Sequence, residues 1–513
     1  MTTTDDFDPL YAAAHPAPLN EVTLYSAPLI IPVTGPVIMD GAIAVAGSRV
    51  VHVGTRRWVL DTLRQDMAAH ARITEHHWHG IITPGLINAH THLQYTNMAE
   101  VGRGTYASFR DWELGFNPVY ERLCAEGDWK ASAEQGARMM VEAGTTAAAD
   151  IVTDPEAAGA LASQGMHGVA YWEVMDWRND DWRKVGVREL VRHLGRMRAE
   201  DLPSIGISPH APYTLETAPF VDLPDIARQL DMRLHIHLAE TPMEAGSSWG
   251  GAGSGGAGGA GVSSADSGAV SFADSVGSTG SAGSVGSVTS LDTPQTAAPS
   301  TLSTYSAAAW RDRDWDSYQQ LKDAGMGASA IQFLDQLGSL GPDVHIAHGV
   351  WADGEDRRIL RQRGVGVALC PRSNRITVTG RDAPIREYLE EGNLLAVGTD
   401  SLSSSPSLDV LNDVAMLYDL AREQGYTGDD LTHRLIRMMT LGGAQELGMH
   451  VGAGRIGQIN AGAMADLAFF DVPVYVATPR GIEDTLEELV RHGAGTNRAT
   501  VISGRVVYND GAF

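Results

Sequence analysis

The sequence is poor in cysteine and has no long apolar run. Cys124 and Cys370 are its only cysteines, and they lie far apart with no CxxC spacing. This pattern argues against a disulfide framework and against a thiolate zinc site, and it fits a reducing setting. No apolar stretch reaches the roughly 20 residues of a membrane span, and the acidic N-terminal residues lack the basic and apolar parts of a signal peptide. We therefore expect a cytoplasmic protein without a membrane partner.

Basic residues are also scarce. The chain holds 38 Lys and Arg against 63 Asp and Glu, which gives a formal net charge of -25. A surface of this sign repels phosphate backbones, so nucleic acid is not an expected partner. Hydrophobic residues make up 43% of the 513 residues, enough for a sizeable core in one or two folded units. The composition therefore indicates a large globular protein.

Both ends of the sequence contain short apolar runs separated by Gly-rich or Asn-Asp-Gly turns, as in EVTLYSAPLIIP, GAIAVAGSRVVHVG and ATVISGRVVYNDG. Such runs predict the strands of a small antiparallel sheet. The simplest arrangement joins residues 22–80 and 451–513 in one small β-sandwich domain that flanks a central domain. Residues 1–21 are expected to form a disordered tail.

Residues 81–450 have a different pattern, in which short apolar strands alternate with helical stretches. Eight such strands are predicted, in IITPGLINAH, TTAAADIV, HGVAYWEV, SIGISPHAP, RLHIHLAE, VHIAHGV, GVGVALCP and LLAVGTD. This repeat is what a parallel (β/α)8 TIM-like barrel requires, so the predicted fold class is α/β. Polar residues stand at the C-terminal ends of the strands, where barrels of this kind place their catalytic groups.

One segment of the barrel region, residues 246–308, consists almost wholly of Gly, Ser, Ala, Thr and Val. It carries too little large apolar surface to offset the entropy of ordering, so we expect a disordered insertion. The insertion follows HLAE and therefore leaves the barrel on the side of the polar strand ends. A tolerated insertion without a role is the simpler interpretation, and a mobile cover over the site is the alternative.

Histidine and carboxylate residues mark the predicted strand ends. His90 and His92, in PGLINAHTHL, project from one strand face, so both imidazoles can bind one metal ion. In HIHLAET, His237 ends a strand and Glu240 follows three residues later, where a carboxyl group near a metal can move protons. His235 shares the strand face of His237, and we expect it to have a structural role.

Two further strands end in titratable residues. His348 closes the strand in VHIAHGV, and Asp400 follows the last strand in AVGTDSLSSS. Taken alone, Asp400 could cap the next helix, because aspartate is a favoured N-cap residue. Coincidence is a poor explanation for the order HxH, His, His, Asp along one β/α chain, so a metal centre is favoured.

This ordered set resembles the amidohydrolase superfamily over residues 22–513, with the Gly/Ser-rich segment set aside. The sequences HTHLQYTN, SPHAPYT, HLAET, CPRSNR and GTDSLSSSPSLDVL look like the branch that contains adenosine, S-adenosylhomocysteine and aminodeoxyfutalosine deaminases. The resemblance implies roles for individual residues. One divalent ion would be held by His90, His92, His237 and Asp400. Catalysis would use Glu240, His348 and Asp400, and His210 would contact the substrate.

The resemblance also bears on the number of metal ions. Some members of the superfamily bridge two metals with a carboxylated lysine on the fourth strand. The three lysines here, Lys130, Lys184 and Lys322, end no predicted barrel strand. A mononuclear site is therefore favoured. Three imidazoles and a carboxylate suit zinc, and iron(II) is the alternative because ligand type does not separate the two.

The reaction implied by the resemblance is hydrolytic deamination of an adenine-type nucleoside. The first implied substrate is 6-amino-6-deoxyfutalosine, which would give futalosine and ammonia in menaquinone biosynthesis. Ser373, Asn374 and Arg375, in CPRSNR, are expected substrate contacts. The sequence SSSPSLD departs from the SSN-type sequence usual after the metal aspartate, which affects the expected substrate contacts of this loop and not the metal site.

The substrate carboxylate would suit a guanidinium, which can bind it with two hydrogen bonds. The candidates near the predicted mouth of the barrel are Arg103, Arg110, Arg372 and Arg375. Each of them also fits an ordinary solvated surface arginine.

Several alternatives stay open. The substrate can instead be S-adenosylhomocysteine, methylthioadenosine or adenosine, or a triazine or guanine-like ring, and substrate profiling separates these. A metal-free scaffold is the alternative of a different class, which metal analysis separates. The implied partner is a small purine nucleoside, and the sequence leaves a homodimer open.

Overall fold

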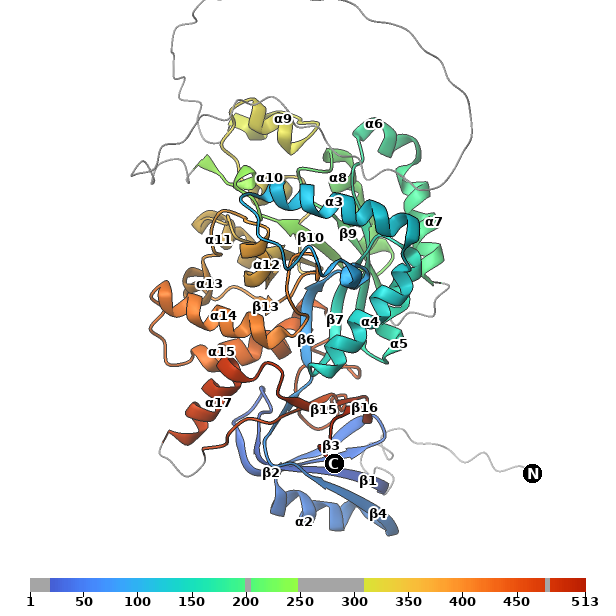
Figure 1. Ribbon diagram of the computed structural model, residues 1–513, viewed down its shortest axis with the longest axis vertical. Coiled ribbons are helices and arrows are strands. Elements are labelled where there is room, and N and C mark those ends of the chain that lie inside the picture. Colours follow the sequence, from blue (N-terminus) through green and yellow to red (C-terminus); the bar gives the residue numbers. More distant parts are fainter. Residues whose placement is uncertain (1–18, 199–203, 248–308, 476–479) are drawn as a thin grey trace, which may run out of the picture.

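The computed structural model describes residues 19–198, 204–247, 309–475 and 480–513. Figure 1 shows a barrel with helices around it and, at one end of the molecule, a second sheet built from both ends of the chain. This confirms the predicted fold class. The first strand, β1, begins at Leu19, before the expected start of the folded chain. The rest of the predicted tail (residues 1–18) and residues 248–308 of the predicted insertion lie outside the described residues.

The barrel sheet contains eight strands, β6 to β13, and each strand pairs with its neighbour in chain order. Their bounds are β6 Leu86–Thr91, β7 Thr145–Val152, β8 His167–Val174, β9 Ile205–Pro209, β10 Leu234–Leu238, β11 Val344–His348, β12 Gly366–Leu369 and β13 Leu395–Val397. All the pairings are parallel. The backbone N–H of Asp400 donates to the His90 carbonyl at 3.0 Å, which joins the last strand to the first.

These strands form because their apolar runs are buried on both faces. Every residue of β6 and β7 is buried, which is expected where helices cover one face and the barrel interior the other. A large apolar cluster fills the layer between strands and helices. In helix α4 (Trp129–Glu142), the buried side chains recur at helical spacing, and Asp128 caps the helix by accepting from the Ala131 N–H.

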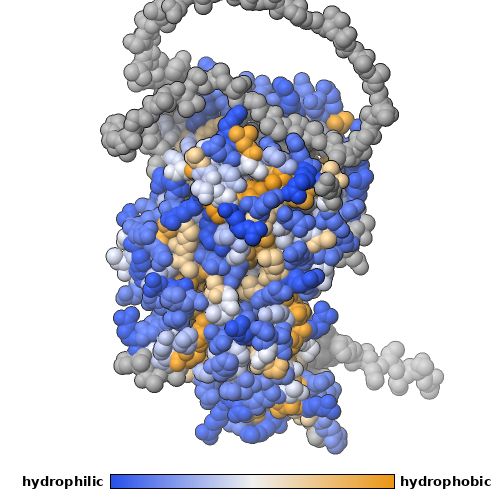
Figure 2. Space-filling model, in the orientation of Figure 1, coloured by the Kyte–Doolittle hydropathy of each residue, from blue (hydrophilic) through white to orange (hydrophobic). Residues whose placement is uncertain are grey.

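The remaining helices follow the strands along the chain or extend the C-terminal part. They are α2 Arg56–Asp66, α3 Phe109–Glu126, α5 Ala160–Ser163, α6 Asn179–Asp181, α7 Val187–Arg198, α8 Thr217–Gln229, α9 Tyr318–Asp323, α10 Ala330–Gln336, α11 Gly354–Arg363, α12 Pro371–Ile376, α13 Ile385–Glu391, α14 Val410–Glu423, α15 Leu431–Arg437, α16 Gly443–Glu446 and α17 Gly481–His492. Among the described residues, no helix is both long and apolar enough to cross a membrane. Most of the face shown in Figure 2 is hydrophilic.

The second sheet combines N-terminal and C-terminal strands, drawn in blue and red in Figure 1. Its strands are β1 Leu19–Ile30, β2 Ile38–Ala46, β3 Arg49–Thr55, β4 Met67–His77, β5 Ile81–Pro84, β14 Leu467–Phe470, β15 Asn497–Ile502 and β16 Arg505–Asn509. The order is β16-β15-β14-β5-β1-β2-β3, and β4 pairs with β1 in parallel. The two ends of the chain are therefore far apart in the sequence but form one sheet.

Residues 81–90 are divided between the two sheets, whereas the sequence pattern predicted a single barrel strand. Strand β5 pairs with β1 and β14 in the second sheet, and the barrel begins only at Leu86. The break lies at Gly85, where a Cβ atom would come within 2.1 Å of the Thr146 hydroxyl oxygen. Pro84 and Gly85 thus allow the chain to pass tightly from one sheet to the other.

The C-terminal part also contributes to the barrel. Helix α17 packs against α14 and α15, which cover the barrel near its last strand. The expected sandwich region 451–513 therefore contains one helix that belongs spatially to the barrel layer.

Candidate metal centre and active site

Four side chains from three regions of the barrel meet at the C-terminal ends of the strands. His90 lies in β6, His92 follows it, His237 lies in β10 and Asp400 follows β13. The Nε2 atoms of His92 and His237 are 3.2 Å apart. Asp400 Oδ1 is 3.6 Å from His90 Nε2 and 3.6 Å from His92 Nε2. The structure therefore brings together the four residues expected to bind metal.

These separations fit a divalent ion. In a tetrahedral site with zinc bonds of about 2.0–2.1 Å, neighbouring ligand atoms lie about 3.3 Å apart. His90 Nε2 is buried and has no hydrogen-bond partner in the described part of the chain, which leaves its lone pair available. Burial, followed by the neighbouring imidazoles, lowers the pKa of His90 and His237 well below the ordinary range, so both rings are neutral and able to coordinate.

The backbone is strained at three points around this cluster. His348, Asp400 and Ala239 have φ values of 74°, 58° and 55°, in the left-handed region that non-glycine residues rarely adopt. Such conformations cost about 1–3 kcal/mol each and persist where surrounding contacts hold them. The strain falls on two predicted catalytic residues and on the residue before Glu240, which marks these strand ends as a functional site.

Glu240 and His348 face each other beside the expected metal ligands. Glu240 Oε1 is 3.7 Å from His348 Nε2, and both residues are buried. The Tyr213 hydroxyl donates to Glu240 Oε2 at 3.3 Å, and the other carboxyl oxygen, Oε1, faces His348. Burial raises the pKa of Glu240, although His348 opposes this effect. A carboxyl group that holds its proton closer to neutrality suits proton transfer.

Glu244 holds the turn that presents Glu240. Its carboxyl oxygens accept from the backbone N–H groups of Ala239, Glu240 and Thr241 at 2.8, 2.9 and 2.9 Å. The side chain is fully buried, and burial raises its pKa to about 7. The sequence analysis did not identify Glu244, although the spacing Thr-x-x-Glu from Thr241 is the signature of a capping box.

Ser373 and Asn374 lie in the site but have partners within the protein. The Ser373 hydroxyl donates to Asp400 Oδ2 at 2.6 Å, and Asn374 Oδ1 is 2.9 Å from His348 Nδ1. Both residues are buried. They hold the side chains of Asp400 and His348 in place, and the substrate contacts expected of Ser373 and Asn374 stay predictions.

His210 lies beside the cluster, and the substrate contact expected of it stays a prediction. Its ring centroid is 4.8 Å from that of His237, and its Nδ1 is 2.9 Å from the Thr214 hydroxyl oxygen. Burial, followed by the charges of His92 and His348, lowers its pKa to about 3. His235 lies beneath the cluster, where its Nε2 is 3.0 Å from His90 Nδ1. It therefore contacts His90, one of the expected metal ligands, on the side of the ring away from Asp400.

The arginine candidates differ in their surroundings. Arg375 pairs with Asp382 at 3.0 Å and its side chain is 55% exposed, so its substrate contact stays a prediction. Arg372 is mostly buried and pairs with the fully buried Asp413 at 2.6 Å, which gives it a structural partner. Arg103 donates to the Ala99 carbonyl.

Two buried carboxyl groups were missed by the sequence analysis. Asp150, in β7, accepts from the Leu93 N–H at 2.9 Å, and burial raises its pKa to about 8. Glu173, in β8, lies 3.7 Å from His237 Nδ1. Burial, with Asp400 and Asp176 adding to the effect, raises the pKa of Glu173 to about 8. A carboxylate near the end of an apolar strand is the signal that could have identified both.

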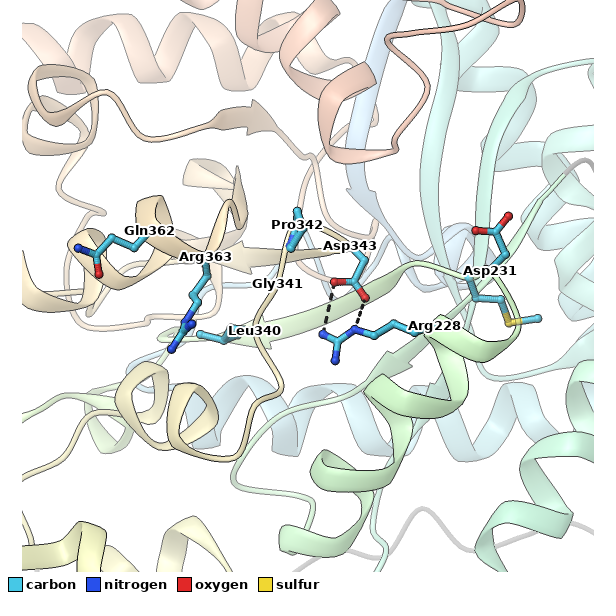
Figure 3. A pocket seen from close by; sticks show the side chains of 9 residues that line it. Arg228, Asp231, Leu340, Gly341, Pro342, Asp343, Gln362 and Arg363 are labelled. Carbon is cyan, nitrogen blue, oxygen red and sulfur yellow. Dashed lines mark hydrogen bonds and ion pairs between the residues drawn. The ribbon is translucent and has the colours of Figure 1, made fainter.

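A separate pocket lies at the opposite, amino-terminal ends of the strands (Figure 3). It lies between the residues that precede β10 and β11 and the end of α11, with Arg228 and Asp343 joined by a hydrogen bond of 2.9 Å. Arg363, on its rim, pairs with Asp335. Arg228 and Arg363 are already paired with carboxylates, and none of the four expected metal ligands lines the pocket. This pocket is therefore distinct from the candidate active site.

Comparisons with known proteins agree with this geometry. A model of the amidohydrolase family matches residues 81–256 and 313–507. A 5-methylthioadenosine/S-adenosylhomocysteine deaminase of Moorella thermoacetica is 27% identical over 93% of this chain and 92% of its own length.

Two solved structures share the fold. A zinc-bound adenosine deaminase from Xanthomonas campestris superposes with a TM-score of 0.68 at 21% identity, over 96% of this chain and 94% of its own. The Helicobacter pylori aminofutalosine deaminase, in complex with methylthio-coformycin, gives a TM-score of 0.64 at 16% identity, over 94% and 99% of the two chains. The strand order, the cluster of histidines and the family match lead to one conclusion: this chain is an enzyme of the amidohydrolase family.

Proposed function

We propose that the protein is a metal-dependent hydrolase that removes the amino group of an adenine-type nucleoside. The observation that carries the proposal is the metal-ligand cluster beside the Glu240–His348 pair, whose Oε1 and Nε2 atoms are 3.7 Å apart. Deaminases of adenine nucleosides among the relatives support the substrate class.

The ligand set would be His90, His92, His237 and Asp400. When bound there, a divalent ion supplies the Lewis acidity that makes water a competent nucleophile near neutral pH. Zinc is favoured for three imidazoles and one carboxylate, and iron(II) is the alternative.

Asp400 and His348 would act on the attacking water. Ser373 donates to Asp400 Oδ2 at 2.6 Å, and the Ser401 N–H donates to Oδ1 at 2.7 Å, so the carboxylate is held in one orientation as it accepts a water proton. An amide oxygen only accepts hydrogen bonds, so His348 Nδ1 carries a proton and donates it in a hydrogen bond to Asn374 Oδ1. The Nε2 of a neutral His348 is then an acceptor that orients the water.

Glu240 would protonate the ring nitrogen next to the carbon that is attacked. Tyr213 holds Oε2, which leaves Oε1 for the transfer. The water oxygen forms a bond to the ring carbon, and the amino nitrogen takes the proton that Asp400 accepted from the water. The bond from the carbon to that nitrogen then breaks and ammonia leaves. The hydroxyl proton returns to Glu240 as the carbonyl forms, and the ring nitrogen keeps the proton it received, so adenine becomes hypoxanthine and both carboxyl groups are restored.

The first proposed substrate is 6-amino-6-deoxyfutalosine, which would give futalosine in menaquinone biosynthesis. The fold shared with an aminofutalosine deaminase is compatible with this choice. S-adenosylhomocysteine, methylthioadenosine and adenosine are the alternatives, and 27% identity to the Moorella thermoacetica protein favours the first two of them. The cytoplasmic location and the homodimer stay predictions.

The experiment that tests the proposal measures ammonia release by zinc-loaded protein. The panel contains aminodeoxyfutalosine, S-adenosylhomocysteine, methylthioadenosine, adenosine, guanine and a triazine. Turnover of an adenine nucleoside that falls by at least ~100-fold in Glu240→Gln protein is the expected result, because general acid–base catalysis contributes about 10²–10⁴-fold. Turnover of guanine or the triazine alone would contradict the proposed substrate class. The preferred nucleoside identifies the substrate.

A further inference from the structure

Glu173 is a buried carboxylate that faces two histidines of the site. It lies in β8 and is 6% exposed, and it is not among the site residues predicted from the sequence. Its Oε1 is 3.7 Å from His237 Nδ1 and 4.0 Å from His210 Nε2, and it has no hydrogen-bond partner in the described part of the chain. A buried carboxylate oxygen without a donor is costly, so a role is expected for it.

His237 presents its two nitrogens to different surroundings. Its Nε2 lies 3.2 Å from His92 Nε2, among the metal ligands. Its Nδ1 is buried on the other edge of the ring, without a hydrogen-bond partner among the described residues, and faces Glu173. If Nε2 binds the ion, a neutral ring carries its proton on Nδ1, and that proton needs an acceptor.

His210 does not compete for the carboxylate. The Thr214 hydroxyl donates to the Ala211 carbonyl at 3.1 Å, so its oxygen accepts from His210 Nδ1 at 2.9 Å. A neutral His210 therefore has its proton on Nδ1 and a lone pair on Nε2, the atom that faces Glu173. This leaves the N–H of His237 as the donor for Glu173.

We propose that Glu173 is a positioning residue that accepts a hydrogen bond from His237 Nδ1 and fixes Nε2 toward the metal ion. The proposal rests on the proposed metal site. The present 3.7 Å separation has to shorten to the ordinary hydrogen-bond range of about 2.7–3.2 Å. A carboxylate behind a ligand histidine sets the ring orientation and raises its basicity, and loss of such a partner weakens metal binding about 10–100-fold.

The test compares zinc affinity, measured by competition with a chromophoric chelator, among the wild-type protein and three variants. Glu173→Ala removes the acceptor, and Glu173→Gln keeps an acceptor of the same size that cannot ionise. Glu446→Gln is the matched control, because Glu446 is a buried carboxyl whose oxygens have no partner among the described residues. It contacts Gly366, the first residue of β12, at the opposite end of the strands.

We expect zinc to bind Glu173→Ala about 10–100-fold more weakly than the wild type. Glu173→Gln should lose less zinc affinity, and Glu446→Gln should keep the wild-type affinity. The visible spectrum of the cobalt-substituted protein should change in Glu173→Ala, because the His237 ring is free to rotate. Unchanged affinity and an unchanged cobalt spectrum in a folded Glu173 variant would overturn the proposal. An equal loss in Glu446→Gln would also overturn it, because the effect would then be general. Wild-type protein that binds no zinc would instead contradict the proposed function.

Discussion

Replacement of Glu244 by alanine should both destabilise the protein and displace Glu240. The side chain accepts from three backbone N–H groups at 2.8–2.9 Å and is fully buried. Each N–H left without an acceptor costs about 1–3 kcal/mol, so the summed cost is about 3–9 kcal/mol, less whatever entering water recovers. The same hydrogen bonds hold Ala239 at a φ of 55°, a conformation that costs about 1–2 kcal/mol.

The catalytic effect follows from the same contacts. When Ala239 relaxes, the Glu240 carboxyl moves from its position 3.7 Å from His348. A displacement of about 1 Å at a reacting group lowers the rate about 100-fold. We therefore expect the free energy of unfolding to fall by at least ~3 kcal/mol and kcat to fall about 100-fold, with a smaller change in KM.

The loss of stability in Glu244→Ala should depend on pH. Burial raises the pKa of Glu244 to about 7 from 4.5, so the folded state holds this proton more tightly than the unfolded chain does. The stabilisation by Glu244 is complete below about pH 4.5 and falls as the pH rises through about 7, by ~3 kcal/mol in all.

Urea unfolding at pH 5 and pH 8, with steady-state kinetics, measures these effects. Glu355→Ala is the control, because Glu355 is a half-exposed residue paired with Arg358 on α11 and should change stability by less than about 1 kcal/mol. A Glu244→Ala protein with wild-type unfolding at pH 5 and wild-type kcat would refute this reasoning.

Two other substitutions test single contacts. Ser373→Ala removes the 2.6 Å hydrogen bond to Asp400 Oδ2 and should weaken zinc binding about 10-fold, as measured by chelator competition, whereas unchanged affinity would show that Ser373 does not orient the ligand. Arg372→Met leaves the fully buried Asp413 without its partner and should lower the free energy of unfolding by about 3–5 kcal/mol in urea. If Arg372→Met raised KM and left stability unchanged, Arg372 would bind the substrate carboxylate.

The barrel and the clustering of the histidine and aspartate side chains could be predicted because their signals are local. Several apolar runs end in a histidine or are followed by an aspartate, and parallel strands bring such ends together, as His90, His237 and Asp400 show. The division of residues 81–90 was not predicted, because IITP and LINAHT have the same apolar pattern. The change of sheet is visible only in the strand pairings, which join β5 to β1 and β14 and β6 to β7.

The supporting residues of the site depend on tertiary contacts that sequence spacing does not contain. Ser373 and Asn374 were identified by their motif, but the motif does not say whether they face a substrate or Asp400 and His348. Glu173 lies inside the apolar run HGVAYWEV, and its importance depends on the distance to His237, which comes from another strand. The orientation of a polar side chain within a barrel is set by its neighbours across strands.

The most direct test of the metal-dependent mechanism is a titration of metal-free protein with zinc. Ammonia release from an adenine nucleoside is measured at each addition. Activity that is absent without zinc and rises in proportion to a plateau at one equivalent per chain is the predicted result, because His90, His92, His237 and Asp400 lie close enough together to form the one proposed set of ligands. Full activity in metal-free protein, or a plateau at two equivalents, would contradict the mononuclear site.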